Sequence, residues 1–207
     1  LFVLLGIVSF SIPSKHVLKN VKESNKNFNK HPNMSSPFIK SKRNSNTTDY
    51  FTEALIINNM ISVKKTNKLN SVLLVPRYHN YEINNPQRLW NQVNYAVGHQ
   101  HEAPDHFYPR YWHGSTFLYR ILMSFTNYSN IVWLIYFTSS LLLLWFFFKL
   151  NNSLGFKLIL PLAISLIFIN VYLMQFMIQF SSVLLIALIS SLFLINRIKK
   201  YKSPYPV

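Results

Sequence analysis

The 207 residues of this chain carry a formal net charge of +15, and half of them are hydrophobic. The chain has no cysteine, which excludes disulfide partners, thiolate catalysis and cysteine-based metal sites. All six acidic residues lie within residues 13–128, whereas Lys149 and Lys157 are the only charged residues of 131–196. A soluble fold keeps a polar face on each element. The uneven charge therefore indicates an integral membrane protein.

The chain opens with an apolar stretch, residues 1–12, that stops at Pro13. It is shorter than the ~20 residues that cross a bilayer. Two interpretations fit this stretch: the end of a truncated transmembrane helix, or the apolar part of a signal segment. We favour the helix end, because Ser9-x-Ser11 is a poor cleavage site.

The next segment, residues 14–48, is rich in Lys, Asn and Ser, and this composition predicts a mostly disordered chain. Tyr50–Ile61 then has apolar residues at helical intervals after Thr48-Asp49, which could cap a helix. This pattern predicts a short amphipathic helix on the membrane surface or against the spans. Residues 71–75, ended by Pro76, predict a short strand or buried extended segment.

Residues 77–120 are dense in aromatic side chains, histidine and proline, which is typical of a structured loop. The three apolar segments that follow predict transmembrane helices at 131–148, 158–174 and 180–196, with a tight hairpin at 175–182. The predicted fold is therefore an all-α membrane protein with about three to four transmembrane helices, counting the first stretch, and a long, partly disordered extramembrane loop.

Short loops set the orientation, because lysine and arginine favour the cytoplasmic side. The turn at 149–157 and the basic tail at 197–207 should therefore be cytoplasmic. The long segment 13–128 should be extracytoplasmic, since long loops are translocated largely regardless of charge. Membrane lipids are the expected partner. A nucleic-acid partner is not expected, because no nucleic-acid motif is present and the basic region lies outside.

Polar groups that could carry chemistry are concentrated between His99 and Arg120. One interpretation takes four of them as ligands of zinc or a similar ion: His99, His101, Glu102 and His113. The spacing argues against it, because no H-E-x-x-H or similar signature is present. We expect neither a metal nor another cofactor.

A catalytic interpretation of the same segment takes Asp105 or Glu102 as a general base. Arg110 and His113 would then bind an anionic phosphate, with Tyr111 and Trp112 as further substrate contacts. A simpler interpretation is favoured by composition. It places an aromatic belt at the membrane interface and has two arginines meet lipid headgroup phosphates. The belt would consist of Tyr108, Tyr111, Trp112 and Tyr119, and the arginines would be Arg110 and Arg120.

The string from Tyr108 to Gly114 (YPRYWHG), followed by an aromatic stretch and a span, resembles a family of polytopic membrane proteins. These are proteins of low-GC Gram-positive bacteria, in which a Y-x-R-Y-W-H-G-like motif ends the first large outer loop. Residues 175–194 also resemble a later helix hairpin of that family. The likeness covers roughly residues 100–196. Family members continue through many more helices, so we expect this chain to be a fragment.

The family is similar in layout to GT-C membrane glycosyltransferases, which use lipid-linked sugar donors. This likeness implies Asp105 as the first catalytic candidate, with Arg110 or His113 near the phosphate, and a lipid-linked sugar as a partner. Two functions stay open from the sequence. One is an enzyme, or enzyme fragment, acting on cell-envelope glycans or lipid-linked sugars. The other is a non-catalytic membrane protein or subunit whose outer loop binds a partner or lipid headgroups.

Overall fold

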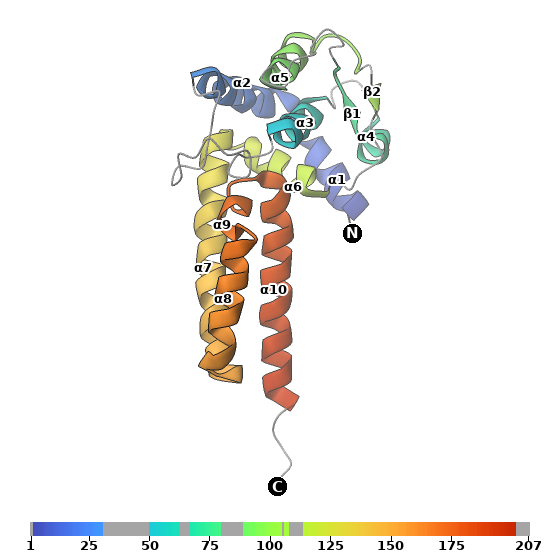
Figure 1. The fold of residues 1–207 in the computed structure, drawn as a ribbon. Coiled ribbons are helices and arrows are strands. Elements are labelled where there is room, and N and C mark those ends of the chain that lie inside the picture. The colour runs from blue at the N-terminus through green and yellow to red at the C-terminus, as the bar shows by residue number, and fades with distance from the viewer. Residues whose placement is uncertain are drawn as a thin grey trace. The chain divides into compact units, whose positions relative to one another are not determined.

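The computed structural model describes residues 2–30, 50–62, 67–79, 89–104, 106–107 and 114–201. Most of them are helical (Figure 1), so the prediction of an all-α fold is confirmed. The chain divides into two compact units, Leu1–Ile131 and Val132–Val207. Each unit is described by itself below.

The first unit contains short helices and one small sheet. Its two strands pair antiparallel, with Arg77 opposite His106. The elements in chain order are α1 (Phe2–Ser11), α2 (Ser14–Lys30), α3 (Tyr50–Ile61), α4 (Lys68–Leu74), β1 (Pro76–Arg77), α5 (Leu89–Gly98), β2 (His106–Phe107), α6 (Gly114–Met123) and the first turn of α7 (Tyr128–Leu154).

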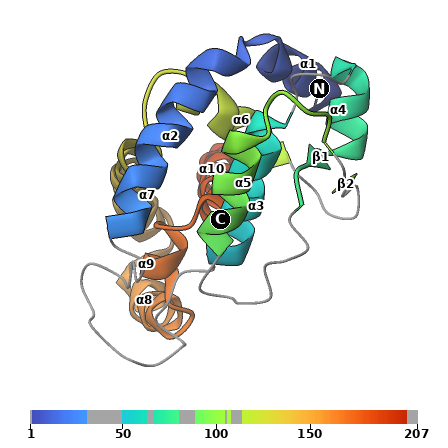
Figure 2. The ribbon, with the colours of Figure 1, turned by 90° about the horizontal axis from the view of Figure 1, so that it is seen from above.

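Helix α3 lies at the centre of this unit. It packs against α2, α5, α6 and β1, and Figure 2 shows α3 and α5 running side by side. The predicted helix Tyr50–Ile61 is confirmed within these bounds. The predicted place on the membrane surface is wrong, because Ile57, Met60, Asn58 and Asn59 are all buried, and the alternative place against the spans stays a prediction. Thr48 and Asp49 lie outside the described residues.

Helix α2 corrects the prediction of disorder for residues 14–48, which is wrong for 14–30. Val17 and Val21, four residues apart, are buried, whereas Lys15, Lys19 and Lys22 are exposed. A low average hydrophobicity hides such a one-sided stripe, and packing against α3, α5 and α6 stabilises the helix. Residues 31–48 lie outside the described part of the chain.

Helix α4 corrects the prediction of an extended segment at 71–75. Asn67 caps the helix, and its side chain accepts a hydrogen bond of 2.9 Å from the amide of Leu69. Val75 ends the helix in the left-handed region at φ 49°. The prediction was wrong because so short an apolar run has no periodicity that separates a strand from a helix.

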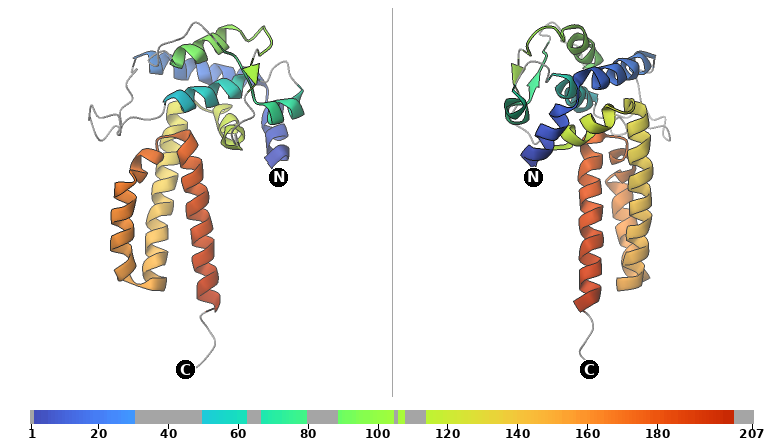
Figure 3. Two further views of the ribbon diagram at one scale, coloured as in Figure 1. Left: turned by 45° about the vertical axis from the view of Figure 1, so that its right-hand side comes forward. Right: turned by 180° about the vertical axis from the view of Figure 1, so that it is seen from behind.

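The second unit contains the remainder of α7 and the helices that follow it. These are η3 (Phe156–Leu158), α8 (Ile159–Phe168), α9 (Val171–Met174) and α10 (Ile178–Tyr201). Figure 3 shows α7, α8 and α10 side by side in both views. Together with α9 they share a core whose members are Val171, Leu184, Leu188, Leu142, Leu143, Phe146, Leu166 and Met174.

Two helices of the described residues are long and apolar enough to cross a membrane, at Tyr128–Ser153 and Ile178–Arg197. The predicted spans 131–148 and 180–196 lie inside them. The predicted span 158–174 is not one helix, because Asn170 adopts a left-handed backbone at φ 54° between α8 and α9.

Both long helices extend beyond their predicted ends. Helix α7 continues to Leu154, so most of the predicted turn at 149–157 is helical, and Gly155 follows it at φ 82°. Helix α10 includes the start of the predicted tail and ends at Tyr201. The first stretch, predicted as a helix end or a signal segment, forms α1, and helical structure agrees with either interpretation.

Candidate functional site

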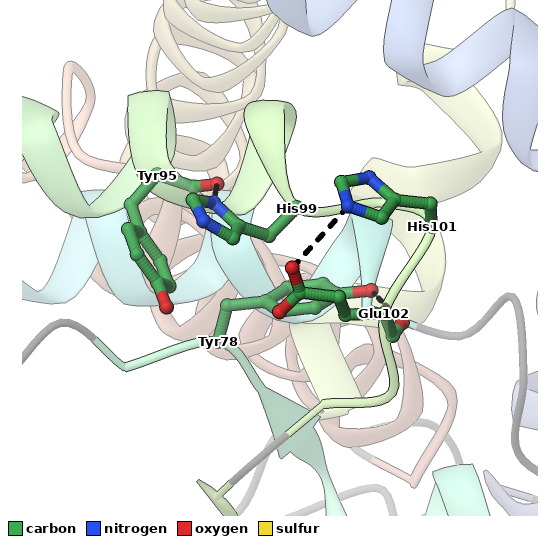
Figure 4. Close-up of polar contacts among 5 residues, drawn as sticks. All are labelled: Tyr78, Tyr95, His99, His101 and Glu102. Carbon is green, nitrogen blue, oxygen red and sulfur yellow. Dashed lines mark hydrogen bonds and ion pairs between the residues drawn. The ribbon is translucent and has the colours of Figure 1, made fainter.

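The turn after α5 carries Glu102, one of the predicted catalytic residues (Figure 4). The backbone of this turn continues the hydrogen-bond pattern of α5, since the amide of His99 donates to the carbonyl of Tyr95 at 3.0 Å. The amide of Glu102 then donates to the carbonyl of His99, also at 3.0 Å. The turn therefore has a defined backbone course.

A chain of buried polar groups fixes this turn from the centre of the unit. Directly after α3, the hydroxyl of Ser62 is within hydrogen-bond distance of two oxygens of Asn58, the backbone carbonyl at 2.7 Å and Oδ1 at 2.9 Å. The Asn58 amide then bonds both backbone groups of Tyr78: Nδ2 donates to the Tyr78 carbonyl at 2.8 Å, and Oδ1 accepts from the Tyr78 amide at 3.0 Å. The Tyr78 hydroxyl donates to the carbonyl of Glu102 at 3.1 Å. The central helix α3, the residue that follows strand β1 and the turn of Glu102 are thus linked in series.

Stacked rings line the same turn. The rings of Tyr95 and His99 lie 3.8 Å apart at 21°, and those of His99 and His101 lie 6.2 Å apart at 20°. Nδ1 of His99 is 2.8 Å from the carbonyl oxygen of Tyr95. Because a carbonyl only accepts hydrogen bonds, Nδ1 carries the proton in this contact.

The carboxylate of Glu102 faces an imidazole at the surface. Its Oε1 lies 3.2 Å from Nε2 of His101, and the two side chains are 53% and 75% exposed. Water screens a pair this exposed, so its attraction contributes little stability. The carboxylate is consequently open to a ligand from solution.

The small sheet places two more histidines together. The rings of His79, which follows β1, and His106, in β2, stack with centroids 5.3 Å apart. Among the described residues, no group of three or more His, Asp or Glu side chains could hold a metal ion. The predicted ligand His113 lies outside those residues.

The other predicted site residues also lie outside the described residues. They are Asp105, Arg110, Tyr111, Trp112 and His113. Of the predicted catalytic and substrate-binding set, the structure therefore describes Glu102, and it places this residue in a turn held by buried contacts.

Arg120 is fully buried, so its predicted contact with lipid headgroups is wrong. Its guanidinium donates to backbone carbonyls of Ser9 at 3.2 Å, of Ile12 at 2.9 Å and of Met60. Burial lowers the pKa of Arg120 to about 10, so it remains a cation at neutral pH. Tyr119 is fully buried too, which removes it from the predicted interfacial belt.

Glu53 is a buried carboxylate that was not among the predicted site residues. It lies on α3, is 2% exposed, and accepts a hydrogen bond of 2.6 Å from the hydroxyl of Tyr128. Its one sequence signal is that it is the only acidic residue in the apolar helix Tyr50–Ile61.

Comparison with known proteins found no matching family model, no matching curated protein and no matching solved structure.

Proposed function

We propose that this chain is an integral membrane protein whose first unit acts at the membrane face. The support is the apolar surface of α7, where large side chains are 41–67% exposed. Exposed apolar surface of this extent is typical of contact with lipid or a partner. Its members include Trp133, Leu134, Phe137, Leu141, Leu144, Trp145 and Phe148. By the distribution of lysines, the first unit is extracytoplasmic and the C-terminus cytoplasmic.

Within that location, we propose an enzyme or enzyme fragment that acts on cell-envelope glycans or lipid-linked sugars. The observation that carries this proposal is the fixed turn of Glu102. Buried contacts hold its backbone, while its carboxylate stays exposed. A catalytic group needs such positioning by rigid elements. The likeness to GT-C enzymes implies a catalytic carboxylate in the loop before this span, with Asp105 as its first candidate.

In the proposed reaction, a carboxylate of Glu102 or Asp105 accepts the proton of an acceptor hydroxyl. The hydroxyl oxygen bonds to the anomeric carbon of the sugar, and the bond from that carbon to the lipid phosphate breaks. The phosphate leaves with the electron pair, and Arg110 and His113 neutralise its charge.

A second function is favoured by the exposure of the Glu102–His101 pair. Active sites exclude water, whereas both of these side chains are open to it. This observation supports a non-catalytic membrane subunit whose outer surface binds a partner or lipid headgroups.

Turnover of a polyprenyl-phosphate-linked sugar by the full chain in vesicles separates the two functions. The assay follows release of polyprenyl phosphate for the wild type, for Glu102→Gln and for Asp105→Asn. Glu23→Gln, at an exposed position of α2, is the matched control. We expect one of the two test variants to lose about 100-fold in rate, the lower end for general acid–base catalysis, while the control keeps its rate. No turnover by the wild type, or wild-type rates for both test variants, would contradict the proposed enzymatic function.

A further inference from the structure

Three helices of the first unit meet at one glycine. A Cβ atom on Gly6 of α1 would lie 2.6 Å from Val72 of α4 and 3.0 Å from Phe117 of α6. Phe10, one turn further along α1, packs edge-on against Phe117 with ring centroids 5.5 Å apart. The face of α1 that holds Gly6 and Phe10 is therefore covered by α4 and α6.

Eight other apolar side chains of these three helices are exposed. The exposed members, called the three-helix apolar surface below, are Val3, Leu4, Leu5 and Val8 of α1, Leu69, Leu73 and Leu74 of α4, and Leu118 of α6. Their exposed fractions run from 40% for Leu74 to 65% for Leu4. Monomeric proteins in water rarely expose so many large aliphatic side chains on neighbouring helices.

Helix α1 offers very little to hydrogen-bond with water. It contains no charged residue. Ser9 is fully buried, and the hydroxyl of Ser11 donates to the carbonyl of Ile7 in its own helix at 2.7 Å. A helix without charged side chains, whose exposed serine hydroxyl is bonded within the helix, suits hydrocarbon surroundings.

Basic side chains follow directly at the C-terminal end of α1. Nζ of Lys68, at the start of α4, donates to Oγ of Ser11 at 3.1 Å. Lys15 and Lys19 of α2 are exposed after Pro13. Cations beside an apolar surface match the phosphate headgroups that border the apolar layer of a bilayer.

The chain itself leads from this surface to a helix of membrane-spanning length. Helix α6 ends at Met123, and α7 begins at Tyr128. Phe125, in the connection between them, is 81% exposed. Leu118 therefore lies ten residues before the start of a proposed span. This short connection favours lipid over a soluble partner as the molecule that covers the three-helix apolar surface.

We propose that the three-helix apolar surface is immersed in the apolar layer of the bilayer, with Lys68 and Lys15 at the headgroup level. Lipid acyl chains are the occupant. The first unit would then be a domain partly embedded in lipid and not a loop surrounded by water. This proposal rests on the membrane location proposed above.

Spin labels on single cysteines test this proposal in the full chain, which has no cysteine of its own. The chain is placed in phosphatidylcholine vesicles that contain phosphatidylglycerol. Labels at Leu4 and Leu73 probe the surface, a label at Leu144 probes α7, and one at exposed Asn91 of α5 is the aqueous control. Power saturation compares collisions of each label with oxygen and with a polar nickel chelate.

We expect Leu4, Leu73 and Leu144 to collide with the nickel chelate about tenfold less than Asn91 does, because polar solutes are excluded from hydrocarbon. Their collisions with oxygen should be raised. Nickel access at Leu4 and Leu73 with protection at Leu144 would overturn this inference alone. Protection at Leu4 and Leu73 from both reagents, with spin–spin broadening, would show a second copy as the occupant and also overturn it. Nickel access at Leu144 would overturn the membrane location itself.

Discussion

The hydroxyl of Tyr128 donates a hydrogen bond of 2.6 Å to Oε2 of Glu53, and both side chains are buried. Glu53 belongs to the central helix α3, and Tyr128 is the first residue of α7. The bond therefore joins the core of the first unit to the first turn of the helix that leads out of it. A buried carboxylate needs such donors, because burying an uncompensated charge costs several kcal/mol.

Tyr128→Phe tests this joint. We expect the free energy of unfolding of the first unit to fall by ~1–3 kcal/mol, because the carboxylate keeps its burial and loses a donor. Chemical denaturation in detergent measures it, and Tyr172→Phe, at a partly exposed tyrosine of the second unit, is the matched control. Glu53→Gln should lower the free energy of unfolding by less in the Tyr128→Phe background than in the wild type. Equal costs in both backgrounds would mean that the two residues are not coupled.

Arg120→Lys should be almost as damaging as Arg120→Ala. The guanidinium reaches carbonyls of Ser9, Ile12 and Met60 at once, and lysine is a point charge that does not reproduce the planar fork. We expect a loss of ~3–5 kcal/mol for alanine and most of that for lysine. Thermal unfolding of the purified chain reports both. A lysine variant as stable as the wild type would show that charge alone matters here.

The stabilising contribution of Arg120 should be independent of pH up to about 9. Burial lowers the pKa of Arg120 to about 10 in the folded state, well below its value in the unfolded chain. Below about pH 9 both states hold the proton, so the difference in unfolding free energy between the wild type and Arg120→Gln stays constant.

Above pH 10 the unfolded state holds the proton more tightly than the folded state does. The unfolding free energy of the wild type should then rise, relative to that of Arg120→Gln, by up to ~1.4 kcal/mol per pH unit. Denaturation of both proteins from pH 7 to 11 checks the sign, and taking the difference cancels the titration of the other lysines and tyrosines. A difference that changes between pH 7 and 9 would contradict this assignment.

Asn58→Leu should release the turn that carries Glu102. The variant loses the bonds to both backbone groups of Tyr78, and we expect a cost of about 2 kcal/mol or more. Faster hydrogen exchange at the Tyr78 amide should accompany it. Asn59→Leu is a close control, because Asn59 is equally buried while its Oδ1 accepts no hydrogen bond from the described residues. Equal costs for the two variants would remove Asn58 from its positioning role.

Apolar patterns predicted the helices with the strongest signals. Tyr50–Ile61 is helical within the predicted bounds, and the predicted spans 131–148 and 180–196 lie in α7 and α10. The absence of charged residues over the predicted span 158–174 did not reveal that its helix is broken. That break is the left-handed backbone of Asn170.

Contacts between distant segments account for what the sequence did not predict. Arg120 donates hydrogen bonds to backbone carbonyls 108 and 111 residues away. Every residue has a backbone carbonyl, so the side-chain pattern does not indicate which ones Arg120 binds. The buried stripe of α2 is short, and its stability comes from helices far along the chain. For the candidate site, the sequence selected Glu102 as one candidate, and its catalytic role stays a prediction. The support of its turn through Asn58 and Tyr78 could be found only from the fold.

Cysteine labelling on intact cells tests most directly whether the first unit lies at the outer face of a membrane. Single cysteines replace exposed Asn91 on α5, Asn152 near the end of α7, and Leu144 on the apolar surface of α7. A membrane-impermeant maleimide should label Asn91→Cys on intact cells, Asn152→Cys only after permeabilisation, and Leu144→Cys in neither case. Labelling of Leu144→Cys without denaturant would contradict the membrane location. Labelling of Asn152→Cys on intact cells, with Asn91→Cys protected until permeabilisation, would invert the topology and contradict action on the cell envelope.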